Sequence, residues 1–284
     1  MKHSVTIEQR KQLRLTPCYL LLALWLVFLV STIGWIVAAS LSSTKEIFKH
    51  ELLQSGPHFD NYVRVWIYNN VSQYFLNSVI TTVISCTGVV IISAPAAYIL
   101  GQKRFYGRNA LVNMFLASMS VPGVMIIIPI YAIAARLNLI GNMVTLIALY
   151  TVVNVPYTVY FLTSFFSTIP NSLEEAALMD GCTQAQAFWK VVLPMAQPGI
   201  ITVTIFNFMG IWNEYFMALI FANSSDNTRT LAVGLQNMIN AMKYSGDWSG
   251  LFAAVLIVFL PTFILYLFMS ERIIAGVTGG AVKG

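Results

Sequence analysis

Charged residues are scarce in this sequence. Asp, Glu, Lys and Arg make up only 10% of its 284 residues, whereas an ordinary soluble domain carries about 25%. Apolar residues account for 57% of the chain, and its mean hydropathy is +0.72. A folded surface built from this composition cannot be covered by groups that bind water. The composition therefore excludes a water-soluble globular protein and predicts an all-α integral membrane protein.

Cysteine and histidine are also rare, with three of each. Cys18, Cys86 and Cys182 lie far apart, without metal-ligand spacing, and the histidines are scattered outside the apolar runs. We therefore expect no disulfide, no metal site, no cofactor and no catalytic residue in this chain. The phosphate-binding pattern G-x-x-x-x-G-K-[ST] is also absent. The chain is thus not expected to hydrolyse ATP by itself.

Long apolar runs dominate what is present. A helix needs about 20 mostly apolar residues to cross a bilayer. The first run exceeds the about 7 to 15 apolar residues of a secretory signal, so we interpret it as an uncleaved anchor despite the small residues Ala38-Ala39-Ser40. Prolines inside the runs are compatible either with ordinary kinks or with a bundle that flexes. We predict six transmembrane helices within a domain of residues 18–271, at about 18–40, 76–100, 109–135, 143–166, 199–221 and 249–270.

The positions of the basic residues indicate membrane orientation rather than nucleic-acid binding. Despite a net charge of +5, they cluster beside apolar runs, as in Arg10, Lys11 and Arg14, and in the loop at 101–110. With the N-terminus in the cytoplasm, ten basic residues lie inside and six outside. We therefore predict an N-in, C-in topology. Residues 1–17 form the cytoplasmic N-terminus, 222–248 an external loop and 272–284 a cytoplasmic tail.

The loop at 167–198 is longer than a connector needs to be. Ser172–Glu175 matches a capping box, Gly181 is a helix terminator, and Thr183–Gln186 matches a second capping box before Pro194. We predict two short helices joined at a glycine corner. An amphipathic helix on the membrane surface would carry more Lys and Arg than Lys190 alone. Docking of this loop to another protein is therefore favoured.

These residues resemble a known family. Glu175-Ala176-Ala177, then Gly181, and then Val191 followed by Leu193-Pro194, match the EAA loop of membrane subunits of binding-protein-dependent ABC importers. Val191 is the one departure, since the family often has Ile there. The end of the chain from Glu271 to Gly284, Trp212-Asn213-Glu214 and Thr230–Gly234 resemble permeases of maltose-transporter type.

The resemblance implies a type I ABC importer permease fold and a set of partners. These are a second homologous permease, two ATPase subunits that bind ATP and Mg²⁺, and an extracytoplasmic sugar-binding protein. It also implies a coupling site for the ATPase at Glu174, Glu175, Ala176, Ala177, Asp180, Gly181, Leu193 and Pro194. The tail, with Gly279, Gly280 and Lys283, would contact the ATPase subunits, although a disordered tail is the alternative.

Polar and aromatic residues in the fifth predicted span and around the end of the predicted external loop are candidates for the transport path or for contact with the binding protein. Glu214 is the acidic residue expected inside a span, with Asn207 and Asn213 near it, and it could line the path or serve helix packing. Lys243, Tyr244 and Trp248 occupy the place of a loop that contacts the binding protein in similar permeases. The aromatic pair could instead anchor the last span at the membrane interface.

The sequence thus predicts a subunit of an ATP-driven sugar importer in the bacterial inner membrane. It would form half of the translocation path and take a di- or oligosaccharide. The alternative is a secondary transporter or channel that works without ATP. That class usually shows buried ion or proton ligands across several helices, and here Glu214 alone qualifies.

Overall fold

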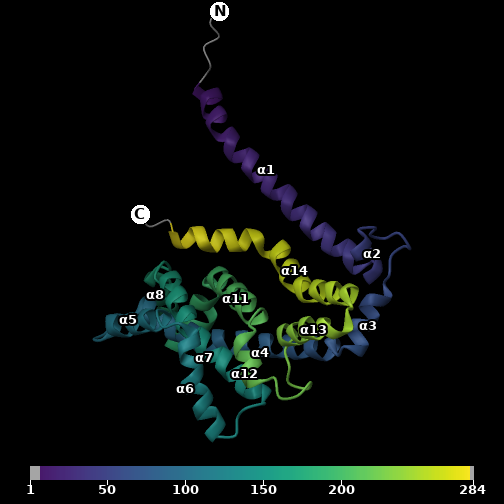
Figure 1. Ribbon diagram of the computed structural model, residues 1–284. Coiled ribbons are helices and arrows are strands. Elements are labelled where there is room, and N and C mark those ends of the chain that lie inside the picture. The colour runs from purple at the N-terminus through teal and green to yellow at the C-terminus, as the bar shows by residue number, and fades with distance from the viewer. Residues whose placement is uncertain (1–6, 282–284) are drawn as a thin grey trace, which may run out of the picture. The chain divides into compact units, whose positions relative to one another are not determined.

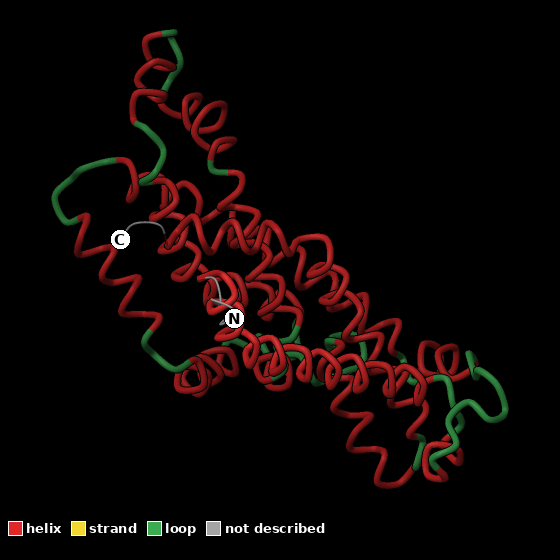
Figure 2. The backbone as a smooth tube through the Cα atoms, turned by 90° about the horizontal axis from the view of Figure 1, so that it is seen from above, coloured by secondary structure: helices red, strands yellow, loops and turns green. Residues whose placement is uncertain are grey.

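The computed structural model describes residues 7–281, and over that range every regular element is a helix (Figure 2). The chain divides into two compact units, which are described separately. One contains the residues up to Asn69 together with Ile239–Ile257, and the other contains Asn70–Met238 and the residues from Val258 onward. The all-helical prediction is therefore confirmed for the described residues.

The first unit begins with a long apolar helix, α1 (Ile7–Ser40), shown in purple in Figure 1. Within Leu15–Ser40, a window of 18 residues has a mean hydropathy of 2.5, and most of the large apolar side chains are exposed within the unit. Such a helix needs a hydrophobic surrounding along its length. At its end, the buried Asn61 amide donates hydrogen bonds to the carbonyls of Ser40 (2.9 Å) and Ser42 (3.0 Å).

Two short helices that the sequence analysis did not identify follow α1. They are α2 (Thr44–Lys49) and α3 (Asp60–Tyr68). Glu46 on α2 is buried, and its carboxylate accepts bonds from the Ser43 N–H (2.8 Å), the Ser55 N–H (2.7 Å) and the Ser55 hydroxyl (2.5 Å). These bonds, the Ser55 hydroxyl foremost, lower the pKa of Glu46 to about 2. The carboxylate therefore holds this connection together in its ionised form.

The second unit is built around α4 (Val71–Gln102) and α7 (Met143–Phe166), which pack closely along much of their length. Gly101 allows this approach, because a Cβ there would lie 2.9 Å from both the Phe166 Cβ and the Thr163 carbonyl oxygen. The predicted span at 143–166 coincides with α7, and the predicted span at 76–100 lies inside α4.

The prediction of one continuous helix at 109–135 is wrong. The structure has α5 (Arg108–Met119) and α6 (Gly123–Arg136), whose axes differ by 93°. Pro122 explains the break, because proline lacks an N–H donor and restricts the residue before it to extended backbone. A bend of this size is a broken span or a re-entrant segment rather than a kink.

The predicted helix at 199–221 is also interrupted. It consists of α11 (Gln197–Trp212) and α12 (Phe216–Phe221), separated at residues 213–215. Glu214 lies in this break and bonds to the N–H groups of Met217 (2.8 Å) and Ala218 (3.1 Å) at the start of α12. The polar pair Asn213-Glu214 therefore ends one helix and caps the next.

The predicted external loop at 222–248 contains the helix α13 (Leu231–Ser245) and is therefore not an irregular loop. The last helix, α14 (Trp248–Ala281), includes the predicted span at 249–270 and continues beyond it, so the predicted tail at 272–284 is helical as far as Ala281. Lys283 lies outside the described residues. Among the described helices, four are long and apolar enough to cross a membrane, or up to six if each of two bent pairs counts as one span.

Candidate functional site

The segment at 167–196 forms the helical corner that the sequence predicts. Its first helix, α8 (Asn171–Met179), starts directly after Pro170, so the predicted capping box at Ser172–Glu175 is wrong. Gly181 has a φ of +85°, and the N–H groups of Gly181 and Cys182 donate to the carbonyls of Leu178 (3.1 Å) and Ala177 (3.0 Å). This pair of bonds is a Schellman motif, which requires the left-handed backbone that glycine adopts without strain.

The second half of the corner begins at the predicted residue. Thr183 and Gln186 form a complete capping box before α9 (Gln184–Ala187). A π-helical turn (Phe188–Val192) and α10 (Leu193–Met195) follow, and the segment bends by 72° into α11. Pro194 was expected to end the second helix, but it occupies the first turn of α10. Its missing N–H costs little there, because proline is tolerated in the first turn of a helix.

Most of the residues predicted to contact an ATPase lie on the outer face of this corner. Two residues outside the predicted set are exposed here as well, Met179 at 88% and Trp189 at 57%. Leu193 is partly buried, and Ala177 is buried against the unit. The exposed members of the predicted set are Glu175, Ala176, Asp180, Gly181 and Pro194.

Glu174 is an exception, and the prediction that it lies on a docking surface is wrong. Only 5% of its side chain is exposed, because it points into the unit rather than away from it. Its Oε1 accepts a hydrogen bond from the Tyr98 hydroxyl (2.7 Å) and forms an ion pair with Lys103. The two neighbouring acids therefore have different surroundings, since consecutive residues on a helix point about 100° apart.

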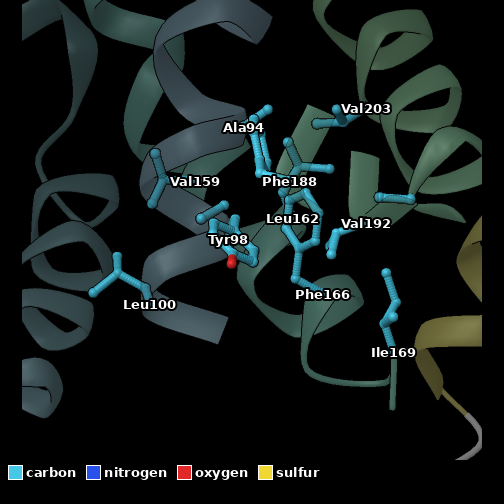
Figure 3. Close-up of a cluster of buried hydrophobic side chains, with 12 residues drawn as sticks. Ala94, Tyr98, Leu100, Val159, Leu162, Phe166, Ile169, Phe188, Val192 and Val203 are labelled. Carbon is cyan, nitrogen blue, oxygen red and sulfur yellow. The ribbon is translucent and has the colours of Figure 1, made fainter. Parts of the chain in front are cut away.

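Tyr98 is the point at which both halves of the corner meet α4. Its ring packs on Phe188 of the second half, with centroids 4.8 Å apart, and on Phe166 at the end of α7, at 6.1 Å. Figure 3 shows these side chains gathered with Leu162 and Val192 in one apolar cluster. Beside them, the Gln102 amide donates to the carbonyls of Phe166 (2.7 Å) and Ile169 (2.9 Å).

Tyr98, Gln102 and Lys103 were not identified as site residues from the sequence. Lys103 was interpreted only as part of the basic loop that sets orientation. The one available signal was the position of Tyr98, Gln102 and Lys103 at or near the end of a long apolar run, and this does not specify a partner far away in the chain. The structure supplies the partners, which are Glu174 for Tyr98 and Lys103 and the carbonyls of Phe166 and Ile169 for Gln102.

The polar residues predicted for the transport path have mainly structural contacts. Asn207 is buried and bonds to the Thr158 hydroxyl (3.0 Å), which ties α11 to α7. Glu214 accepts a hydrogen bond from the Tyr150 hydroxyl (2.7 Å) in addition to capping α12. Asn213 is exposed and bonds only locally, to the Met209 carbonyl (2.8 Å).

The other predicted contact residues lie at the ends of α13 and α14. Tyr244 is 93% exposed, near the end of α13. Trp248, the first residue of α14, is 38% exposed and packs edge-on against Phe48 with ring centroids 5.8 Å apart. Gly279 and Gly280 belong to the last turns of α14. The side chain of Lys243 is not among those described. In the described part of the chain, no group of His, Cys, Asp and Glu residues has metal-binding geometry.

Comparison with known proteins relates this arrangement to a family. Residues 93–277 match the model of the "Binding-protein-dependent transport system inner membrane component" family. The diacetylchitobiose uptake system permease protein NgcG of Streptomyces coelicolor is 33% identical over 93% of this chain and 87% of its own length. The trehalose transport system permease protein SugB of Mycobacterium tuberculosis is 31% identical over 88% of this chain and 91% of its own.

A solved structure has the same fold. A chain in the crystal structure of a bacterial ABC transporter involved in alginate import superposes with a TM-score of 0.80. The alignment covers 93% of the present chain and 97% of that one, at 23% sequence identity.

Proposed function

On the premise that this chain belongs to the binding-protein-dependent transport system inner membrane component family, we propose that it is the membrane-spanning subunit of an ATP-driven sugar importer. It forms half of the translocation path and works with a second permease, two ATPase subunits that bind ATP and Mg²⁺, and an external sugar-binding protein. Both relatives described above carry the name of a disaccharide, which supports a di- or oligosaccharide as the substrate.

The observation that carries this proposal is the exposed helical corner at 167–196. Glu175, Met179 and Trp189 project from a short, locally stabilised structure that is bent sharply away from α11. An outward-facing acid beside bulky apolar side chains suits a protein partner better than a lipid surface, which favours basic residues. The corner docks on an ATPase subunit and transmits its movement to the helices that follow.

The proposed topology has six membrane crossings, two of them broken, with both termini in the cytoplasm. The number of helices is compatible with it if each bent pair crosses once. This arrangement brings the corner and the basic residues of the 101–110 loop to the cytoplasmic side, as the positive-inside rule favours. It assigns the whole complex to the inner membrane of a bacterium.

The transport path uses fewer of the candidate residues than the sequence suggested. Asn213 is exposed beside the break between α11 and α12, and interrupted helices line substrate sites in other transporters. Tyr244 and Trp248 remain candidates for contact with the binding protein, because exposed aromatic rings suit sugars and protein interfaces. Asn207 and Glu214 support the broken helix α11–α12 through their bonds to α7.

A secondary transporter or channel is the competing proposal. It would need buried acids or histidines arranged along several helices to carry a coupling ion. Among the described residues, the buried or half-buried acids Glu46, Glu174, Glu214 and Asp247 are each occupied by hydrogen bonds within the chain. The comparisons also favour the importer.

Purification of the tagged chain from its native membrane in mild detergent tests the proposal. Mass spectrometry should identify a second permease and an ATPase. The recovered complex should hydrolyse ATP faster when its binding protein and sugar are added. A chain that is recovered alone or as a homo-oligomer, without an ATPase, would refute the importer.

A further inference from the structure

The helix α8 carries two acids, Glu174 and Glu175, and the second of them begins the Glu175-Ala176-Ala177 motif. They are neighbours in sequence, yet Glu175 is exposed while 5% of the Glu174 side chain is exposed. A buried carboxylate is costly unless it is paired and hydrogen-bonded. Glu174 meets both conditions, through the ammonium group of Lys103 and the Tyr98 hydroxyl. Its role therefore lies inside the unit.

The contacts of Glu174 join two parts of the chain, α8 and the end of α4. Glu174 belongs to α8, Tyr98 to the last turns of α4, and Lys103 is the residue at which α4 ends. The Lys103 ammonium also lies 5.5 Å from the centroid of the Tyr98 ring, so the cation meets both partners at once. We define these three residues as the α4–α8 joint.

Further contacts around the joint restrict its movement. Phe188 also packs on the Tyr98 ring, and Figure 3 shows both rings within the apolar cluster. Gln102 holds the end of α7 and the connection to α8 through its bonds to Phe166 and Ile169. At Gly101 the backbone of α4 lies directly against Thr163 and Phe166 of α7. Both halves of the corner are thereby fastened to the same end of α4.

We propose that the α4–α8 joint makes the helical corner and the end of α4 move as one body, so that Glu174 and Lys103 position α8 for coupling without touching the ATPase. This inference rests on the proposed function. When the ATPase displaces the outer face of the corner, the joint delivers that displacement to α4, and through α4 to α7. An ion pair suits this task because loss of the Lys103 ammonium leaves the buried Glu174 carboxylate without its charged partner.

The first test uses the intact complex in proteoliposomes and compares sugar transported with ATP hydrolysed. Glu174→Gln and Lys103→Gln should leave the ATPase bound but lower the sugar transported per ATP by about tenfold, within the usual range of coupling between distant sites. Arg104→Gln, at the adjacent exposed cation, is the matched control and should couple as the wild type does. The double exchange Glu174→Lys with Lys103→Glu should restore most of the coupling, which a loss of packing alone would not allow.

The second test does not depend on the variants folding. Spin labels are placed at positions 99 on α4 and 171 on α8, both exposed, in a chain whose three cysteines are replaced by alanine. Their separation should stay constant between the nucleotide-free and ATP-bound complex. A separation that changes when ATP binds would refute the proposal that the corner and the end of α4 move as one body. So would single variants that couple normally, or a double exchange that assembles but couples no better than the singles. By contrast, a wild-type chain that binds no ATPase would refute the proposed function itself.

Discussion

Substitution of Gly181 tests whether the corner depends on backbone geometry. A Cβ built at Gly181 meets nothing within 4 Å, so a side chain there encounters no steric clash with its neighbours. The whole cost comes from the φ of +85°, which an ordinary L-residue adopts at a cost of about 1–2 kcal/mol. Asn tolerates this conformation better than Ala, and a β-branched residue tolerates it least.

A strain of about 1–2 kcal/mol changes the ratio of formed to opened corner by roughly 5- to 30-fold. We therefore expect ATPase retention and sugar uptake to fall in the order Gly181→Asn, Gly181→Ala, Gly181→Val. The assay is the amount of ATPase that co-purifies per tagged chain, together with uptake in proteoliposomes. Gly210→Ala is the matched control, because Gly210 also has open space around its Cβ position but lies within α11. Wild-type uptake in Gly181→Val would refute the reasoning.

Three further predictions concern stability. Gly101→Ala should lower the thermal midpoint of the purified chain by several degrees, because overpacking against Phe166 costs about 1–3 kcal/mol. Glu46→Gln should be less stable than the wild type at pH 6. Since the bonds from Ser55 lower the pKa of Glu46 to about 2, the wild-type advantage is full above pH 4.5, and the difference in midpoint should shrink as the pH falls from there towards 2. Glu214→Ala removes the cap of α12, which should cost about 1–2 kcal/mol in thermal unfolding while ATPase retention is unchanged.

Each of these has a control in the same chain. Gly34→Ala adds a Cβ where nothing lies within 4 Å and should not lower the midpoint. Glu51→Gln, at an exposed acid near α2, should not reproduce the pH dependence of Glu46→Gln. Asn213→Ala removes a single local bond beside Glu214 and should have a smaller effect. Equal effects of a variant and its control would contradict the corresponding argument.

The sequence predicts the helices that depend on length and hydropathy. The helix predicted at about 143–166 coincides with α7, because a charge-free apolar run has no other stable form in a bilayer. The breaks at 120–122 and 213–215 were not predicted, because apolar composition is the same on both sides of each. Pro122 was interpreted as one of several possible kinks, and the bend it accompanies is 93°.

In the corner, too, some residues were predicted correctly from the sequence and others were not. Gly181 and the Thr183 capping box act through bonds a few residues away, so their roles can be inferred from the sequence. Which face of α8 is buried depends on packing against α4, which lies far away in the chain. Both Glu174 and Glu175 were therefore assigned to the docking surface, and only the fold separates them. Glu214 was similarly taken for a residue inside a continuous helix.

The hydrogen bonds within the corner affect how tightly a partner can bind it. The Schellman motif at Gly181 and the capping box at Thr183 close within the corner, so its shape exists before any other protein arrives. A disordered segment of the same composition would lose conformational entropy during association. Here that loss has already occurred on folding, and the free energy of contact at Glu175, Met179 and Trp189 is available for affinity.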